Sequence, residues 1–169
     1  MCASGALNIV AHPAVVETLL AAGADFNIRR RTGGGYSALD WACAVGSVAS
    51  IQAFLWHGAD VNSRDDIHGL GDLHRAALND QDCAVDALID AGAEIELRTN
   101  NGKTPLCIAA EAGRSKALLA LLQKGVIHSV RDNRGKTPLH QACRFQEEGV
   151  GTVVDMLLRW GADETAFEP

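Results

Sequence analysis

The chain has 169 residues, of which 47% are apolar, and its formal net charge at pH 7 is −6. This length and apolar content are typical of one domain with a full core, and the acidic balance argues against a nucleic-acid surface, because phosphate backbones are bound by clustered Lys and Arg. The sequence has no apolar run of 18 residues, no secretory leader pattern, and five cysteines without a Cys-x-x-Cys pair. We therefore expect an intracellular protein without a membrane span, disulfide framework or zinc knuckle, in the cytoplasm with the nucleus left open.

Residues 1–28 contain one strong helical pattern. From Ala14 to Ala22 the apolar residues fall on one helical face, and Gly23 ends the pattern. The preceding stretch, residues 6–10, could form a partner helix, although it has no start signal.

Residues 29–63 predict two helices, over 38–45 and 48–57, after a glycine-rich loop at 33–35. Residues 64–97 repeat this pattern with a first helix over 72–79. Gly71 and Asp72 stand there without a capping side chain, so we expect the charge of Asp72 to support the helix start and this unit to be the least stable. Asp80, at the stop of this helix, predicts a left-handed backbone.

Residues 98–130 carry the clearest signals. Thr104 is a helix cap, Pro105 fits the first helical position, and Leu106 begins an apolar face that ends before Gly113. A second apolar pattern runs from Ser115 to the glycine at 125. The following residues, 126–129, depart from the exit sequence of the other units.

Residues 131–163 predict helices over 138–145 and about 151–160, separated by extra residues near 147–150. The last pattern is strongly apolar, and no similar unit follows it. We expect either that the chain is part of a longer protein or that this end face packs on another surface.

These units recur at a fixed period. The first-helix starts lie 34, 33 and 33 residues apart, at Ser37, Gly71, Thr104 and Thr137, and the second-helix stops are Gly23, Gly58, Gly92, Gly125 and Gly161. A helix pair repeated at this period indicates a stacked solenoid. The segment Thr-Pro-Leu-His-Gln-Ala at 137–142 and the Gly-Ala-Asp-x-Asn segments at 23–27 and 58–62 resemble the signatures of the ankyrin-repeat family.

The resemblance implies a mainly α fold, an α-solenoid of stacked helix–turn–helix repeats with short β-hairpin-like projections. It implies one ankyrin-repeat domain over 1–169, with repeats at about 1–28, 29–63, 64–97, 98–130 and 131–163 and a tail at 164–169. It also implies a non-enzymatic module that binds a partner protein through the concave groove of hairpins and first helices. The alternative is a structural spacer or self-associating segment that uses the apolar C-terminal end face.

Aligning the repeats gives the groove residues that the resemblance implies. They are Tyr36, Trp41, Ala44, Val45, Leu70, Arg75, Leu78, Asn79, Lys103, Glu111, Ala112, Lys136, Gln141, Arg144 and Phe145. Arg75, Lys103, Lys136 and Arg144 make this set basic, and Tyr36 gives it an aromatic end. We therefore expect a partner segment with acidic and apolar residues, and neither a nucleic acid, a membrane nor a small-molecule substrate.

The sequence offers little catalytic chemistry. It has no P-loop, no Gly-x-Gly-x-x-Gly, no Gly-x-Ser-x-Gly and no His-Glu-x-x-His, so we expect no enzyme activity, cofactor or metal. The resemblance gives His74 and His140 a structural role, bonding the hairpin backbone. A metal site of Asp66, His68 and His74 matches no known ligand spacing.

Two further predictions concern small side chains. Cys43 and Cys143 replace an alanine of the first helix, so both are expected to be buried. The resemblance makes Asn27 and Asn62 candidates for hydroxylation, although bonding of the loop backbone is the simpler role.

Overall fold

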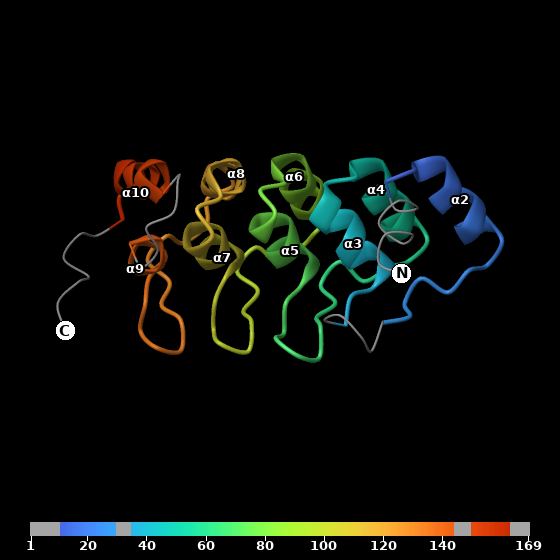
Figure 1. Cartoon of the computed structure of the whole chain (residues 1–169), viewed down its shortest axis with the longest axis horizontal. Helices are drawn as coiled ribbons and strands as arrows, with labels where there is room; N and C mark the ends of the chain where they lie inside the picture. Colours follow the sequence, from blue (N-terminus) through green and yellow to red (C-terminus); the bar gives the residue numbers. More distant parts are fainter. Residues whose placement is uncertain (1–10, 30–34, 144–149, 163–169) are drawn as a thin grey trace, which may run out of the picture.

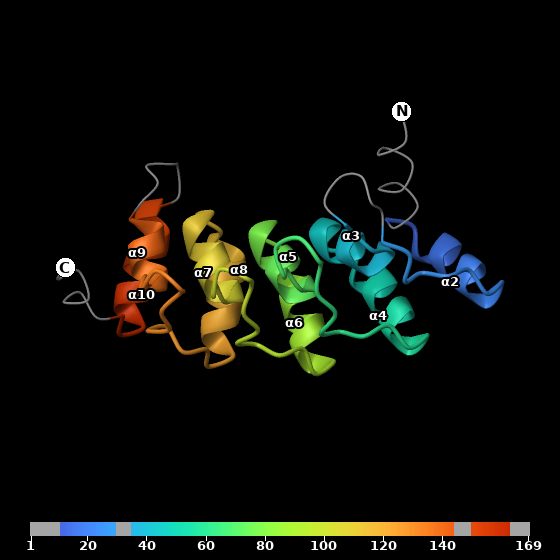
Figure 2. The same ribbon diagram turned by 90° about the horizontal axis from the view of Figure 1, so that it is seen from below.

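The structure is a computed structural model that describes residues 11–29, 35–143 and 150–162 (Figure 1). Its helices form two layers in a row, and long loops project from one side. The first-helix layer contains α3 (Ala38–Val45), α5 (Asp72–Leu78), α7 (Pro105–Glu111) and α9 (Pro138–Ala142). The second layer contains α2 (Pro13–Ala21), α4 (Val48–Trp56), α6 (Asp82–Asp90), α8 (Ser115–Gln123) and α10 (Val150–Arg159). Figure 2 shows the helix pairs following one another along the molecule, which confirms the predicted helical solenoid.

Local sequence signals begin and end these short helices. The Thr104 hydroxyl accepts a hydrogen bond from the N–H of Cys107, and Ser37 and Asp40 form a reciprocal capping box. Such bonds satisfy N–H groups that a helix leaves free at its start. The predicted second-helix stops all have positive φ, between 78° and 91°. The boundaries of the helix pairs are therefore specified within each repeat.

Among the described residues, Asp80 is the one non-glycine residue with a positive φ, at 58°. This value confirms the predicted left-handed backbone. Its carboxylate does more than tolerate that conformation. It accepts hydrogen bonds from the N–H groups of Lys116 and Ala117 at 2.9 and 3.0 Å. These groups lie in the first turn of α8, so Asp80 caps a helix of the following repeat.

The core is built from leucines and small residues that the stacked helices share. Leu106, Ala109 and Ala110 on α7 are 0–1% exposed, as are Leu118 and Leu121 on α8. α5 lies between α3 and α7, and α7 lies between α5 and α9, so these two first helices are covered on both sides. Burial between neighbouring units is what holds helices this short in place.

The projecting loops are linked to each other by main-chain bonds. Asn100 N–H donates to the carbonyl of His68, and Asn133 N–H donates to that of Asn101. His74 extends the linkage, because its Nδ1 accepts from Gly71 N–H and its Nε2 lies 3.1 Å from the carbonyl oxygen of Lys103. This confirms its predicted structural role. The one isolated β-bridge in the described residues joins Arg64 and Gly71, so the projections are hairpin-like loops.

The structure corrects two predictions about side chains. Cys143 is exposed, whereas Cys43 is fully buried. Cys143 comes directly after α9, and in the described chain no further first helix packs over it. Asp72 is fully buried and its pKa is raised, so it does not act as a solvated charge at the helix start.

The irregular exit at 126–129 is bonded to the preceding repeat. Asn62 accepts a hydrogen bond from Glu94 N–H of the following exit loop at 2.7 Å. Glu96 occupies the position equivalent to Asn62 one repeat later and accepts from Ile127 N–H at 2.8 Å. The loop at 126–129 is therefore held at Ile127 by a side chain of the preceding repeat.

Candidate protein-binding groove

An aromatic stack marks one end of the predicted groove. The rings of Tyr36 and Trp41 are stacked, with centroids 4.8 Å apart, and the guanidinium of Arg75 lies 3.7 Å from the Tyr36 centroid. Trp41 and Arg75 come from neighbouring first helices, α3 and α5. We call these three residues the Arg75 stack. Its members are buried or half-buried, so the stack is a fixed platform.

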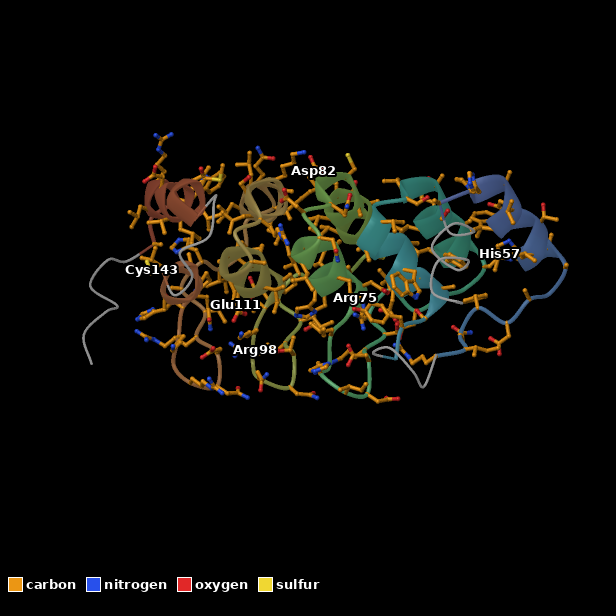
Figure 3. The ribbon with its side chains drawn as sticks, viewed as in Figure 1. His57, Arg75, Asp82, Arg98, Glu111 and Cys143 are labelled. Carbon is orange, nitrogen blue, oxygen red and sulfur yellow. The ribbon has the colours of Figure 1, made fainter. Side chains whose placement is uncertain are left out.

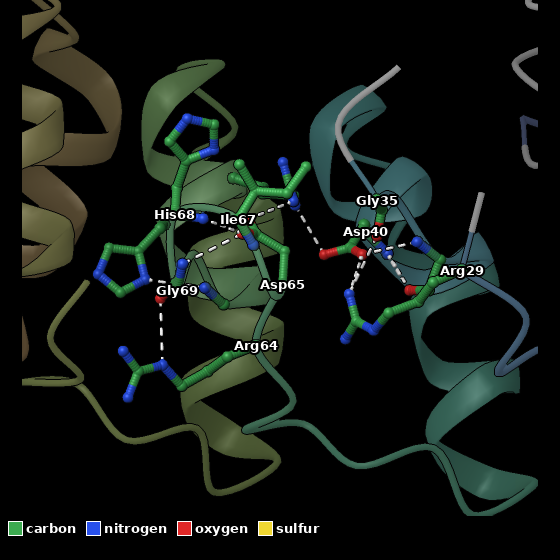
Figure 4. A network of polar contacts seen from close by, with 12 residues as sticks. Arg29, Gly35, Asp40, Arg64, Asp65, Ile67, His68 and Gly69 are labelled. Atoms are coloured by element: carbon green, nitrogen blue, oxygen red, sulfur yellow. Dashed lines mark hydrogen bonds and ion pairs between the residues drawn. The ribbon is translucent and has the colours of Figure 1, made fainter. Parts of the chain in front are cut away.

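The Arg75 stack rests on a buried network of charges, part of which Figure 4 shows. Arg75 Nε donates to Asp40 at 2.7 Å, and Arg75 Nη2 donates to Asp65 at 2.8 Å. Asp40 also accepts from Ser37 N–H at 2.7 Å and from Arg29 at 3.2 Å. The bond between Arg75 and Asp40 thus connects the second and third repeats, and Asp65 holds Arg75 from within the third.

These bonds change the role that we assign to Arg75. Its side chain is 2% exposed and its charge is paired twice. Figure 3 places Arg75 and Glu111 on the first-helix layer. An arginine held in this way positions Tyr36 and cannot offer a free charge to a partner.

Asp65 organises the turn that holds this network. Burial opposes its charge, but hydrogen bonds from the N–H groups of His68, Ile67 and Gly69, together with the Arg75 guanidinium, lower the pKa of Asp65. The carboxylate is therefore ionised at neutral pH and remains a partner for Arg75.

A second part of the groove contains lysines. The ammonium of Lys103 pairs with Glu111 at the end of α7. Lys136 lies one repeat further on and is half-buried, and its ammonium has no ion-pair partner among the described residues. In the sequence, Arg144 stands where Glu111 stands one repeat earlier. Among the described residues, the charge of Lys103 is therefore paired and that of Lys136 is not.

Both lysines line a polar cavity of about 110 Å³. Its other lining residues are Asn101, Asp132, Asn133, Arg134 and Gln141. Gln141 is 1% exposed and donates to Asp132 at 2.6 Å, and Asp132 also accepts from the N–H groups of Arg134 and Lys136. Gln141 thus resembles Arg75, which occupies the same position in its repeat and also reaches back to a loop aspartate.

The remaining predicted residues are spread along the groove or lie elsewhere. Val45 and Leu70 are half-buried, Leu78 is 36% exposed, and Asn79 is exposed and donates to the carbonyl of Arg75. Ala44 and Ala112 are half-buried at the ends of α3 and α7. Arg144 and Phe145 lie outside the described residues.

The sequence alignment missed the acids of this site. Asp40 stands where His74 and His140 stand in their repeats, and this substitution is a signal that the sequence contains. Asp65 and Asp132 carried no separate signal, because a loop aspartate is explained equally well by a solvated turn.

The histidine and cysteine side chains that could carry chemistry have structural roles instead. Burial lowers the pKa of His74 to about 4, so its imidazole is neutral at pH 7 and its two bonds fix it in place. Burial raises the pKa values of the Cys43 and Cys107 thiols, which disfavours the reactive thiolate. In the described ranges, no three His, Cys, Asp or Glu side chains are grouped so as to hold a metal ion.

The structure also shows the surroundings of the two candidate asparagines and the lengths of the helices. Asn62 bonds the backbone of the next exit loop, whereas Asn27 is exposed and its N–H donates to Asp25. Within residues 11–29, 35–143 and 150–162, no helix is both long enough and apolar enough to cross a bilayer.

Comparisons with known proteins agree with this architecture. A family model described as ankyrin repeats in three copies matches residues 73–167, and one described as a single ankyrin repeat matches residues 34–66. Repeats of this kind generally mediate protein–protein interactions, and both family models describe this non-catalytic interaction fold.

Several characterised proteins share parts of the sequence. The human SH3 and multiple ankyrin repeat domains protein 2 is 33% identical over 79 residues, which are 47% of this chain and 4% of that protein. Mouse ankyrin repeat domain-containing protein 40 is 32% identical over 65 residues, 38% of this chain and 18% of that protein. Human 2-5A-dependent ribonuclease is 38% identical over 66 residues, 39% of this chain and 9% of that protein.

The chain thus spans under a fifth of the length of each of these relatives. The period, the stacked helix pairs and the family models, one of which covers more than half of the chain, lead to the same conclusion. The chain belongs to the ankyrin-repeat family.

Proposed function

We propose that this chain is a non-enzymatic module that binds an extended segment of a partner protein in its groove. The observation that carries the proposal is the contrast along the groove. The Arg75 stack makes one part aromatic and rigid, and Lys136 gives another part a positive charge that no carboxylate of the described residues pairs with. A surface fixed before binding reduces the ordering cost of association.

The partner segment is expected to carry acidic and apolar side chains. An acidic side chain would lie in the cavity beside Lys136, where it meets a cation that no described carboxylate neutralises. Apolar side chains would contact Trp41, Val45 and Leu78, which are partly exposed. We propose that Arg75 and Gln141 act by positioning their neighbours, and we retain Arg144 and Phe145 as contacts on sequence register alone.

The test compares two charge reversals of the same size. Lys136→Glu changes the groove, whereas Lys116→Glu changes an exposed lysine on α8. Affinity capture followed by mass spectrometry identifies a partner with the wild-type chain, and calorimetry then measures its binding segment against both variants. We expect Lys136→Glu to weaken binding about tenfold at low salt and less at high salt, because screening reduces exposed charge interactions.

Lys116→Glu should leave the affinity within about twofold of wild type, since surface charges away from a contact contribute little. Equal weakening by both variants would show a nonspecific charge effect. Unchanged binding by Lys136→Glu would contradict the assignment of the acidic side chain to this cavity.

The second candidate is self-association through the C-terminal end face. On α10, Val153 and Leu157 are fully buried, and Val154 and Leu158 are half-buried. Trp160 follows the helix directly and is 44% exposed. Light scattering after size exclusion tests this face. We expect Trp160→Lys to dissociate any dimer, and the control Trp56→Lys, at an 87% exposed position on α4, to leave it intact. A monomeric wild type at high concentration contradicts this candidate.

We further propose an intracellular location, in the cytoplasm, with the nucleus as the alternative. The lack of enzyme signatures and the acidic net charge support a role without cofactor, small-molecule substrate or nucleic acid.

A further inference from the structure

The junction between the second and third repeats contains a third acid that the ion pairs do not use. Asp72, in the first turn of α5, is 0% exposed. Neither of its carboxyl oxygens has a hydrogen-bond partner among the described residues. Its nearest acidic neighbour is Asp40 on α3, which faces it across the junction. Burying a charged carboxylate without any hydrogen-bond donor is costly. A bound proton removes this cost, because it neutralises the carboxylate and makes the carboxyl a donor itself.

The charges around Asp72 also favour its protonated form. Arg29 and Arg75 supply two positive charges, and Asp40 and Asp65 supply two negative ones through the printed bonds. The other titratable groups that face this junction are the Cys43 thiol and the imidazole of His74, and both are neutral at pH 7. Among the charges of the described residues, an ionised Asp72 would leave one unpaired negative charge in the core, whereas a protonated Asp72 balances the junction.

The hydrogen bonds also decide which acid holds the proton. Both oxygens of Asp40 accept from donors, since Oδ1 accepts from Arg75, and Oδ2 accepts from Ser37 N–H and Arg29. The oxygens of Asp72 accept from no such N–H donor among the described residues, so its carboxyl is the one that gains by carrying a hydrogen, which it can donate to Asp40.

We propose that this junction is a proton-binding site, in which Asp72 stays protonated at neutral pH and donates to Asp40, and that the bound proton holds the Arg75 stack in place. The proposal goes beyond the function proposed above and does not depend on any partner. Burial, followed by the negative charge of Asp40, raises the pKa of Asp72 well above its ordinary value of 3.8, in agreement with this assignment.

The connection to the groove follows from Arg75. The same guanidinium bonds Asp40 and lies over the ring of Tyr36. When Asp72 loses its proton, its carboxylate repels Asp40 and competes for Arg75, which draws the guanidinium from its position over Tyr36. Loss of the proton therefore loosens the aromatic part of the groove.

The first experiment measures unfolding of wild type and Asp72→Asn against pH between 4 and 9. Asparagine resembles the protonated acid in shape but has no proton to lose. The unfolding constant of wild type relative to the variant should rise about tenfold per pH unit above pH 4, because only the unfolded wild type ionises there. The rise should end above pH 7, where the folded protein releases the proton. The control Asp82→Asn, at an exposed acid in the first turn of α6, should show no such rise.

A ratio independent of pH, or one that levels below pH 7, would overturn the proton site. If Asp72→Asn does not fold, carbon NMR of the wild-type Asp72 carboxyl tests the same point, since an ionised carboxyl at pH 7 contradicts the proposal.

A second measurement follows Trp41 fluorescence after Trp56→Phe and Trp160→Phe leave it as the only tryptophan. Its emission should change at the pH where the ratio levels, and an unchanged emission would overturn the link to the Arg75 stack.

Discussion

At the scale of single residues, two side chains on α5 have opposite titration behaviour within one turn of helix. Asp72 is held protonated by burial beside Asp40, and His74 is held neutral by burial between two backbone groups. Neither carries charge at neutral pH, although their residue types suggest polar surface positions. Burial without a compensating charge explains both cases.

His74 makes stability depend on acidity in a defined direction. Its pKa is about 4 in the fold and 6.5 when unperturbed, so the unfolded chain binds more protons between these values. The stabilisation is complete above pH 6.5 and is lost as the pH falls toward 4, by about 3 kcal/mol in total. Chemical denaturation should show the stability advantage of wild type over His74→Gln shrinking by this amount from pH 7 to pH 4. An advantage that stays constant over this range would contradict the neutral assignment.

At the scale of elements, each helix start is specified locally, but some helices borrow a cap from the repeat before. α7 uses its own Thr104, whereas α8 begins at Ser115 without a side-chain cap from its N-cap residue, Arg114. Asp80 supplies the missing acceptor from the previous unit. The residue that ends one first helix therefore also starts the second helix of the next repeat.

Substitutions at Asp80 separate these two tasks. Asp80→Ala loses the cap and places a Cβ in the left-handed region without a compensating bond, so it should cost about 2 kcal/mol. Asp80→Gly loses the cap but relieves the backbone, and Asp80→Asn keeps both features. Urea unfolding should rank stability as Asn above Gly above Ala. If Gly matched or exceeded Asn, the bonds to α8 would contribute nothing.

At the scale of the whole molecule, stability comes from the interfaces between repeats. Leu106 lies in the middle of the stack and is 1% exposed. Leu106→Ala should cost about 2–5 kcal/mol through lost burial and the cavity left behind. Thermal or urea unfolding measures this cost. A loss near zero would contradict the packing of α7, and the matched substitution Leu78→Ala, at a 36% exposed position, should cost clearly less. The sequence-based expectation that residues 64–97 form the least stable unit stays a prediction.

The sequence by itself determined the repeat architecture. Caps, prolines and glycine stops act within a few residues, and apolar faces recur at a fixed period, so the helix pairs and their stacking can be predicted from local patterns. The same patterns predicted the left-handed Asp80, and the resemblance to the ankyrin-repeat family implied the linking role of His74. The groove residues were predicted from their positions in the aligned repeats. Position in a repeat does not reveal whether a side chain is free or paired with another residue.

Only the tertiary structure decided the charge states. Arg75 meets Asp40 35 residues away and Asp65 10 residues away, and that pairing turns an expected surface cation into the buried support of Tyr36. Burial against Asp40 raises the pKa of Asp72, and Lys136 has Arg144 at the sequence position where Lys103 has Glu111. Charge depends on the neighbours that a side chain meets in space and on its exposure to water, and in a solenoid those neighbours come from the adjacent repeat.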